Sequence, residues 1–146
     1  MLSDGTSLPN PNQTPGGADR SRPLVLIVED DPDNAHLIAR VLTGAKYDFL
    51  VTSAGRDALQ HARTILPDAI TLDLRLPDID GFALLQQLQS TPETREIPII
   101  VVSILADERD PRLSSAFATL PKPIDRVRLR KTVAAALRQR QPESGT

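Results

Sequence analysis

The stretch Asp68-Ala-Ile-Thr-Leu-Asp-Leu-Arg-Leu-Pro-Asp-Ile-Asp-Gly81 joins a short apolar run to a turn rich in aspartate. Residues 69–72 predict a buried strand, and Pro77 and Gly81 predict that the chain then turns and enters a new element. Asp73 therefore follows the carboxyl end of the strand, where open α/β sheets place their ligands. A single aspartate there, taken alone, is better explained as a loop cap. Its role depends on which residues the other strand ends bring beside it.

Strand-like and helix-like segments alternate along the rest of the chain. Apolar runs predict strands at 24–28, 48–52 and 97–102, with a short one around Leu120. Caps and apolar spacing predict helices from Pro32 to Gly44, over 56–66 with Leu66 facing inward, from Gly81 to about residue 90, and from Asp125 to Gln139. The segment 107–117 contains Pro111 and few apolar residues, which predicts only one or two helical turns.

This alternation predicts a flavodoxin-like (βα)5 fold of the α/β class. We expect a three-layer sandwich around a parallel five-stranded sheet of order 2-1-3-4-5, with a shortened fourth helix. In that order the carboxyl ends of strands one, three, four and five share one rim. The polar residues predicted there are Glu29, Asp30, Asp31, Asp73, Ser103 and Lys122.

These rim residues suit the handling of a phosphoryl group. Converging carboxylates repel one another, and a hard cation such as Mg²⁺ relieves that repulsion. An ionised Asp73 can attack phosphorus and form an acyl phosphate. Ser103 can donate a hydrogen bond to one phosphoryl oxygen, and Lys122 can neutralise another. Each residue alone also has a purely structural explanation, but their joint occurrence favours phosphoryl chemistry.

The composition bounds the class of protein. With 146 residues, a formal net charge of -2 and no cysteine, the chain has the size of one domain and excludes disulfides and thiolate metal sites. No apolar run is long enough for a membrane span, and no signal peptide is apparent, so we expect a soluble, cytoplasmic protein. Residues 1–22 predict a disordered leader and 141–146 a disordered tail, which leaves 23–140 as the domain.

Four motifs resemble the receiver domains of bacterial two-component response regulators. In chain order they are Val-Leu-Ile-Val-Glu-Asp-Asp-Pro at 25–32, Leu-Asp-Leu-Arg-Leu-Pro-Asp-Ile-Asp-Gly at 72–81, Val-Val-Ser at 101–103 and Pro-Lys-Pro-Ile at 121–124. The resemblance covers about residues 24–140. It implies a role in phosphorelay signal transduction, in which an aspartate accepts a phosphoryl group from a histidine kinase or phosphotransfer protein while Mg²⁺ is bound.

The resemblance also implies a role for each acidic residue. Asp73 corresponds to the phosphoacceptor, and Glu29 and Asp30 to the acidic pair, of which Asp30 contacts the metal directly. The backbone carbonyl of Arg75 would be a further metal ligand. Such a domain is not an enzyme beyond catalysing its own phosphorylation and dephosphorylation.

The remaining roles concern the conformational switch. By resemblance, Ser103 is the switch hydroxyl, Lys122 pairs with the phosphoryl group, and the Lys122–Pro123 bond is cis. The family often has an inward-rotating Tyr or Phe three residues before the lysine, where this chain has Thr119. Phe117 lies close enough in sequence to substitute for it, although an apolar core position is the favoured interpretation.

No effector domain follows the last predicted helix, so we expect the output to reach a separate downstream protein. The basic residues of that helix indicate a solvated face, and neither nucleic acid nor membrane is an expected partner. Two alternatives remain. A phosphatase of the haloacid dehalogenase type would need a second aspartate where Arg75 stands. A phosphorylation-independent interaction module on the same fold would not need the intact acidic pair, acceptor and lysine.

Overall fold

The computed structural model describes residues 21–140. The predicted leader at 1–22 and tail at 141–146 lie outside these residues, apart from Ser21 and Arg22, and remain predictions.

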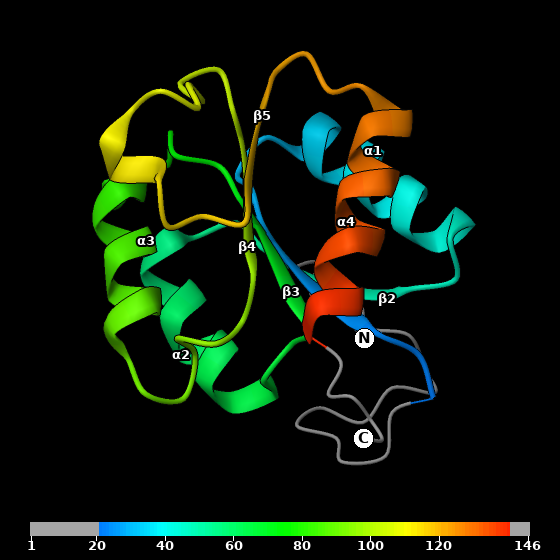
Figure 1. Ribbon diagram of the computed structural model, residues 1–146, viewed down its shortest axis with the longest axis horizontal. Helices are drawn as coiled ribbons and strands as arrows, with labels where there is room; N and C mark the ends of the chain where they lie inside the picture. Colours follow the sequence, from blue (N-terminus) through cyan, green and yellow to red (C-terminus); the bar gives the residue numbers. More distant parts are fainter. Residues whose placement is uncertain (1–20, 141–146) are drawn as a thin grey trace.

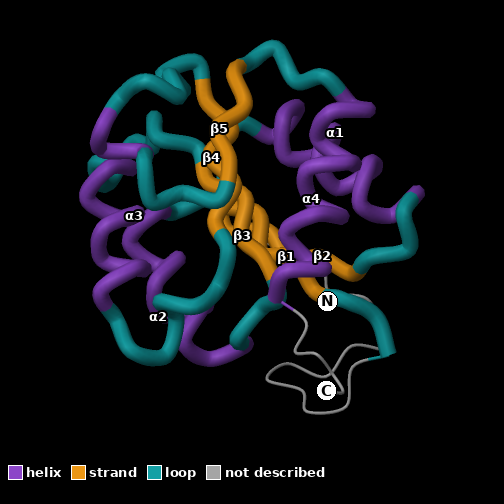
Figure 2. Tube along the Cα trace, in the orientation of Figure 1, coloured by secondary structure: helices purple, strands orange, loops and turns teal. Residues whose placement is uncertain are grey.

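Five parallel strands form one sheet in the order β2-β1-β3-β4-β5. They are β1 (Leu24–Val28), β2 (Asp48–Thr52), β3 (Ala69–Leu72), β4 (Ile99–Ser103) and β5 (Ala118–Pro121). Figure 2 shows the strands stacked through the middle of the molecule with helices on either side. The predicted flavodoxin-like topology is confirmed.

Helices cover both faces of the sheet. They are α1 (Pro32–Gly44), α2 (Gly55–Ile65), α3 (Gly81–Ser90), the short 3₁₀ helix η1 (Pro111–Leu113) and α4 (Arg126–Arg140). Helices α1 and α4 lie on one face, and α2 and α3 lie on the other (Figure 1). The single turn of η1 confirms the shortened fourth helix. Within residues 21–140 no helix combines the length and the apolar character that crossing a bilayer requires.

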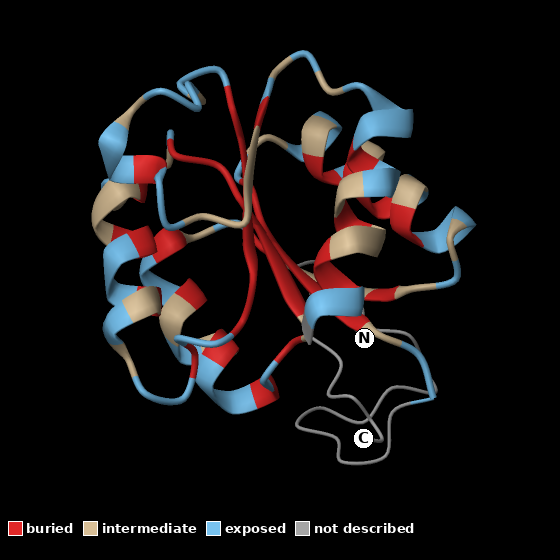
Figure 3. Ribbon diagram, viewed as in Figure 1, coloured by how far each residue is buried: buried red, intermediate tan, exposed pale blue. Residues whose placement is uncertain are grey.

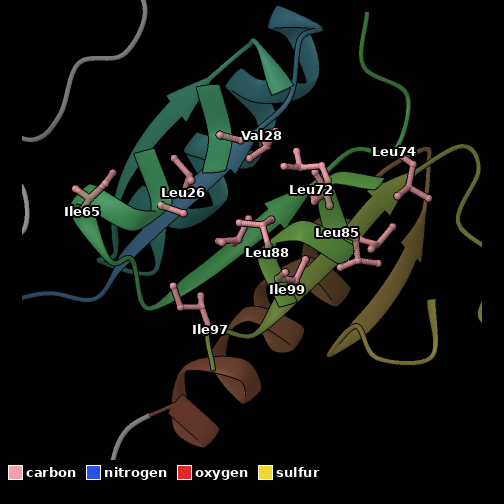
Figure 4. Close-up of a cluster of buried hydrophobic side chains, with 14 of the residues drawn as sticks. Leu26, Val28, Ile65, Leu72, Leu74, Leu85, Leu88, Ile97 and Ile99 are labelled. Carbon is pink, nitrogen blue, oxygen red and sulfur yellow. The ribbon is translucent and has the colours of Figure 1, made fainter. Parts of the chain in front are cut away.

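The sheet separates two hydrophobic core clusters. Along β1, alternate residues point to opposite faces, so that Leu26 packs under α2 and α3 and Ile27 packs under α1 and α4. Both side chains are fully buried, as expected for a central strand covered on each side. Figure 4 shows the cluster under α2 and α3, where Leu72 and Leu88 also lie. Figure 3 shows the buried sheet between helices whose outer faces are exposed.

The predicted caps of the first and last helices form as expected. The Asp31 carboxylate accepts a hydrogen bond from the Asn34 backbone N–H at 3.1 Å, with Pro32 as the first helical residue. The Asp125 carboxylate accepts from the Arg128 N–H at 3.0 Å. Asp80 plays the same part for α3 by accepting from the Phe82 N–H.

Two sequence predictions need correction. Leu66 does not face inward: it ends α2 in the left-handed conformation with φ 50° and is 40% exposed. The following Pro67 disfavours a helical conformation at this position, so the chain leaves the helix one residue earlier. The fourth strand begins at Ile99 and not at Ile97, where the apolar run starts. The Ile97 N–H instead closes a turn onto the Thr94 carbonyl.

The loop after β3 is held against two helices. The Gly81 N–H donates to the Leu74 carbonyl at 3.1 Å, and a Cβ at Gly81 would lie 2.3 Å from the Leu74 Cα. The Asp78 carboxylate accepts from the backbone N–H groups of Gly55 and Arg56, both at 2.9 Å, at the start of α2. These contacts fix the path of the chain that leaves Asp73.

We predict that Gly81→Ala destabilises the fold by about 1–3 kcal/mol, because the added methyl group overlaps backbone atoms that cannot rotate away. Gly44→Ala is the matched control, since nothing lies within 4 Å of a Cβ there. It should leave stability unchanged or raise it by about 0.5 kcal/mol. Urea unfolding of both variants makes the comparison, and equal stabilities would contradict the close approach of the loop.

Candidate functional site

Parallel pairing brings the predicted site residues to one rim. Val28 pairs with Leu72 at the ends of β1 and β3, so Glu29 and Asp73 leave the sheet side by side. The Asp73 N–H donates to the Val28 carbonyl at 3.0 Å, which extends this pairing by one residue. Both side chains are buried, with Glu29 2% and Asp73 5% exposed. Two carboxylates therefore share a desolvated space.

Lys122 reaches the same point from β5. Its backbone N–H donates to the Ser103 carbonyl at 3.3 Å, and its bond to Pro123 is cis, as the resemblance implied. The Lys122 Nζ lies 3.0 Å from Asp73 Oδ2 and 3.0 Å from Glu29 Oε1. Burial acts to lower the pKa of Lys122, but the two carboxylates outweigh it, and the pKa is raised. The ammonium therefore stays charged at neutral pH.

Asp73 is held as a carboxylate. Burial acts to raise its pKa, but the Arg75 backbone N–H, the Lys122 ammonium and the Ser103 hydroxyl together outweigh burial, and the pKa is lowered. The N–H of Arg75 donates to Asp73 Oδ1 at 3.0 Å. An ionised carboxylate with a cation beside it is the state that can act as a nucleophile.

Glu29 behaves differently although it lies next to Asp73. Burial raises its pKa to about 7, the negative charge of Asp73 adds to this rise, and Lys122 opposes it. Its Oε2 atom accepts from the Asp31 N–H at 3.2 Å. Its Oε1 atom is buried and contacts the Lys122 ammonium without hydrogen-bond geometry. Glu29 thus offers a buried oxygen that its protein surroundings only partly satisfy.

Ser103 lies fully buried at the end of β4, and its Oγ accepts from the Leu105 N–H at 3.1 Å. Ile104 and Leu105 are exposed apolar residues beside it. Thr119 is half-buried on β5, opposite Val101. Phe117 packs against the core cluster under α1 and α4, in agreement with the core interpretation. No aromatic ring therefore occupies the family's switch position.

The carboxylates at the rim fit a small divalent cation. Oxygen atoms of Glu29, Asp30 and Asp73 all lie within 4.8 Å of one another, and Asp30 is exposed to solvent. Opposite ligands of Mg²⁺ lie about 4.2 Å apart, so small side-chain movements suffice to bind it. The partly satisfied Oε1 of Glu29 supports the same fit.

Sequence reasoning brought together Glu29, Asp30, Asp73, Ser103 and Lys122, and the structure places them at one rim. It missed Asp78, whose carboxylate caps α2 from 22 and 23 residues away in sequence. No local pattern marks a cap supplied from so far along the chain. Asp31 is the helix cap that the sequence predicts.

The raised pKa of Glu29 predicts a specific pH dependence of stability. The folded state keeps the Glu29 proton up to about pH 7, whereas the unfolded chain loses it near 4.5. The contribution of Glu29 to the free energy of unfolding is therefore fully present below pH 4.5 and is lost as the pH rises to 7. Without added metal, Glu29→Gln should become more stable than the natural protein by about 3 kcal/mol over this range. Urea unfolding at several pH values measures the difference.

The control is Glu96→Gln, which makes the same change at an exposed position. The difference in the free energy of unfolding between this variant and the natural protein should be the same at every pH. A constant difference between Glu29→Gln and the natural protein from pH 5 to pH 7.5 would contradict the raised pKa.

Residues 25–134 match the family described as the response regulator receiver domain. The response regulator PleD of Caulobacter vibrioides is 38% identical over 109 residues, which are 72% of this chain and 24% of PleD. This chain therefore corresponds to about a quarter of that relative. The polar-differentiation response regulator DivK of Brucella ovis is 34% identical over 116 residues, covering 77% of this chain and 94% of DivK.

Solved structures agree with this assignment. A sensor protein from a Polaromonas species has a TM-score of 0.75 and 35% identity, covering 82% of this chain and 98% of that chain. The receiver domain of a Pseudomonas aeruginosa sensor histidine kinase has a TM-score of 0.72 and 28% identity, covering 80% and 98%. That domain was solved with a magnesium ion coordinated in its active-site cleft. This chain belongs to the receiver domains of two-component response regulators.

Proposed function

We propose that Asp73 accepts a phosphoryl group from a phosphohistidine and that Glu29, Asp30, Ser103 and Lys122 assist the transfer. The contact that carries the proposal is the buried ion pair between Lys122 Nζ and Asp73 Oδ2 at 3.0 Å. A lysine held beside an ionised aspartate at a sheet rim keeps the nucleophile charged and supplies a cation for the incoming phosphoryl oxygens.

The proposed transfer needs no oxidant or further reactant. A carboxylate oxygen of Asp73 attacks phosphorus and forms an O–P bond, while the P–N bond to the donor imidazole breaks. The electron pair of that bond goes to the imidazole nitrogen, which takes up a proton from solvent water. The lowered pKa of Asp73 keeps its carboxylate ionised without an added general base.

Glu29, Asp30 and Asp73 would hold a Mg²⁺ ion together with the backbone carbonyl of Arg75. When bound, the ion supplies charge neutralisation for the phosphoryl oxygens. The raised pKa of Glu29 supports this assignment, because a buried carboxyl group that is costly to ionise gains most from a bound cation.

The change of state would be read through Ser103 and Lys122. A phosphoryl group on Asp73 brings about two negative charges and three acceptor oxygens to a site with one ammonium. The Ser103 hydroxyl can then move toward a phosphoryl oxygen and donate a hydrogen bond to it. Because Ser103 Oγ also accepts from the Leu105 N–H, this movement would shift the exposed residue Leu105. Because Thr119 stands where the family often has an aromatic switch residue, the contacts support this hydrogen bond as the link between the phosphorylation site and the protein surface.

Partners follow from this chemistry. The donor would be a histidine kinase or phosphotransfer protein, and the output would act on a separate downstream protein in the cytoplasm. Self-catalysed phosphorylation and dephosphorylation would be the only reactions of the domain. Phosphorylation-independent interaction on the receiver fold is the alternative, and the intact Lys122–Asp73 pair argues against it.

We predict that incubation with Mg²⁺ and acetyl phosphate adds about 80 Da to the protein, the mass of one phosphoryl group, as measured by intact-protein mass spectrometry. Asp73→Asn should abolish the adduct. Asp30→Asn should slow its formation at least about tenfold, because the metal loses a carboxylate ligand. Asp57→Asn is the matched control, an exposed aspartate on α2, and should react like the natural protein.

Two results would contradict the proposal. An unmodified protein under these conditions would indicate an interaction module without phosphorylation. Release of free phosphate that survives Asp73→Asn would indicate a phosphatase with a different nucleophile.

A further inference from the structure

The loop between β3 and α3 carries two of the groups that the proposed magnesium site needs. Asp73 provides a carboxylate, which can rotate onto an ion, whereas Arg75 would provide a backbone carbonyl, which lies where the backbone places it. An isolated bridge between Arg75 and Asp80 closes the base of the loop, and residues 76–79 form its tip. Because Mg²⁺ demands near-ideal octahedral geometry, the path of this loop bears directly on metal binding.

The Asp78 carboxylate ties the tip of the loop to the start of α2. Its Oδ1 atom accepts from the Gly55 N–H and its Oδ2 atom from the Arg56 N–H, both at 2.9 Å. The Arg56 Nε atom lies 3.6 Å from Oδ2 as well. The hydrogen bonds, that from the Arg56 N–H above all, lower the pKa of Asp78 below its usual value. The ionised carboxylate thus uses both oxygens on one helix end.

Helix α2 depends on this contact because its own N-cap residue contributes nothing. Ala54 occupies that position, and no side-chain capping hydrogen bond forms there. Helix α3, in contrast, is capped by Asp80, which accepts from the Phe82 N–H at 3.1 Å. Asp78 therefore caps the helix that precedes its loop and not the helix that follows it.

Packing between the loop tip and α2 is tight at the same place. Gly55 is buried, and a Cβ there would overlap the Ile79 side chain and lie 2.8 Å from Leu76 Cδ1. Leu76 and Ile79 also pack against the core cluster under α2 and α3. Close-packed surfaces transmit displacements, so the start of α2 and the tip of the loop move together.

We propose that Asp78 is a positioning residue for the magnesium site: by fastening the loop tip to α2, it holds the Arg75 carbonyl where the ion can bind it. The inference rests on the metal ligands assigned in the proposed function. Asp78 is not itself one of the clustered rim carboxylates, which among residues 21–140 are Glu29, Asp30 and Asp73. Metal binding and the cap of α2 are then coupled, and each favours the other by the same factor.

The first test titrates isotope-labelled protein with magnesium chloride and follows the amide shifts by NMR, well below the unfolding temperature. Asp78→Ala removes both acceptor oxygens and should raise the Kd for Mg²⁺ at least about fivefold. Asp78→Asn keeps one acceptor oxygen suited to a helix N-cap, so its Kd should lie between those of the natural protein and Asp78→Ala. Both variants lose the same charge, so the difference between them reports the hydrogen-bonded contact.

Asp110→Ala is the matched control. Asp110 caps η1 by accepting from the Arg112 N–H, and its carboxylate lies 2.8 Å from the Arg112 guanidinium. This variant also loses a cap, an ion pair and one negative charge, so its Tm should fall as that of Asp78→Ala does. Its Kd for Mg²⁺ should nevertheless change less than about twofold. A loss of stability that both variants share cannot explain a difference in metal affinity.

Amide hydrogen exchange tests the coupling in the natural protein. Saturating Mg²⁺ should slow exchange at Gly55 and Arg56, neither of which is a proposed metal ligand, and should leave exchange at Arg112 unchanged. In Asp78→Ala at the same metal saturation, the slowing should be absent.

The proposal is overturned if Asp78→Ala binds Mg²⁺ as tightly as Asp110→Ala or Asp78→Asn does, or if exchange at Gly55 and Arg56 does not respond to the metal. A natural protein that binds no Mg²⁺ at the rim overturns it as well. None of these measurements involves a phosphoryl donor. A natural protein that shows the coupling but forms no adduct with acetyl phosphate would therefore refute the phosphotransfer function while supporting the role of Asp78.

Discussion

One buried ammonium determines the arrangement of the rim. Lys122 Nζ lies 3.0 Å from carboxylate oxygens of both Asp73 and Glu29, and all three side chains are largely removed from water. A single positive charge cannot neutralise two buried carboxylates. The two carboxyl groups therefore behave differently: the pKa of Asp73 is lowered and the pKa of Glu29 is raised. The site thus holds a ready nucleophile beside an acidic group that gains from a cation.

The fold supports this arrangement through backbone contacts that lie away from the reacting atoms. Parallel pairing of β1 with β3 sets Glu29 next to Asp73, and pairing of β4 with β5 brings Lys122 into reach. The loop after β3 is held by the close approach of Gly81 to Leu74, and by the Asp78 carboxylate at the start of α2. The charged groups therefore sit on a rigid frame, which lowers the cost of holding them together.

The fold and the rim residues are predictable from the sequence because both depend on short apolar runs and on the polar residues directly after each run. Prediction fails where the outcome depends on distant or competing contacts. Pro67 stops the second helix as predicted, but the helix already ends at Ile65, so Leu66 leaves the helical pattern that its spacing suggests. Asp78 acts on residues more than 20 positions away.

The most direct test is a crystal structure with Mg²⁺ and beryllium fluoride, a mimic of a phosphoryl group. We expect the beryllium atom to be bonded to a carboxylate oxygen of Asp73. Its fluorine atoms should lie within hydrogen-bond distance of Lys122 Nζ and Ser103 Oγ. The metal should contact Asp30, Asp73 and the carbonyl of Arg75. An adduct on another residue, or a Lys122 side chain that stays on Glu29 and does not reach the adduct, would contradict the central role of the shared ammonium.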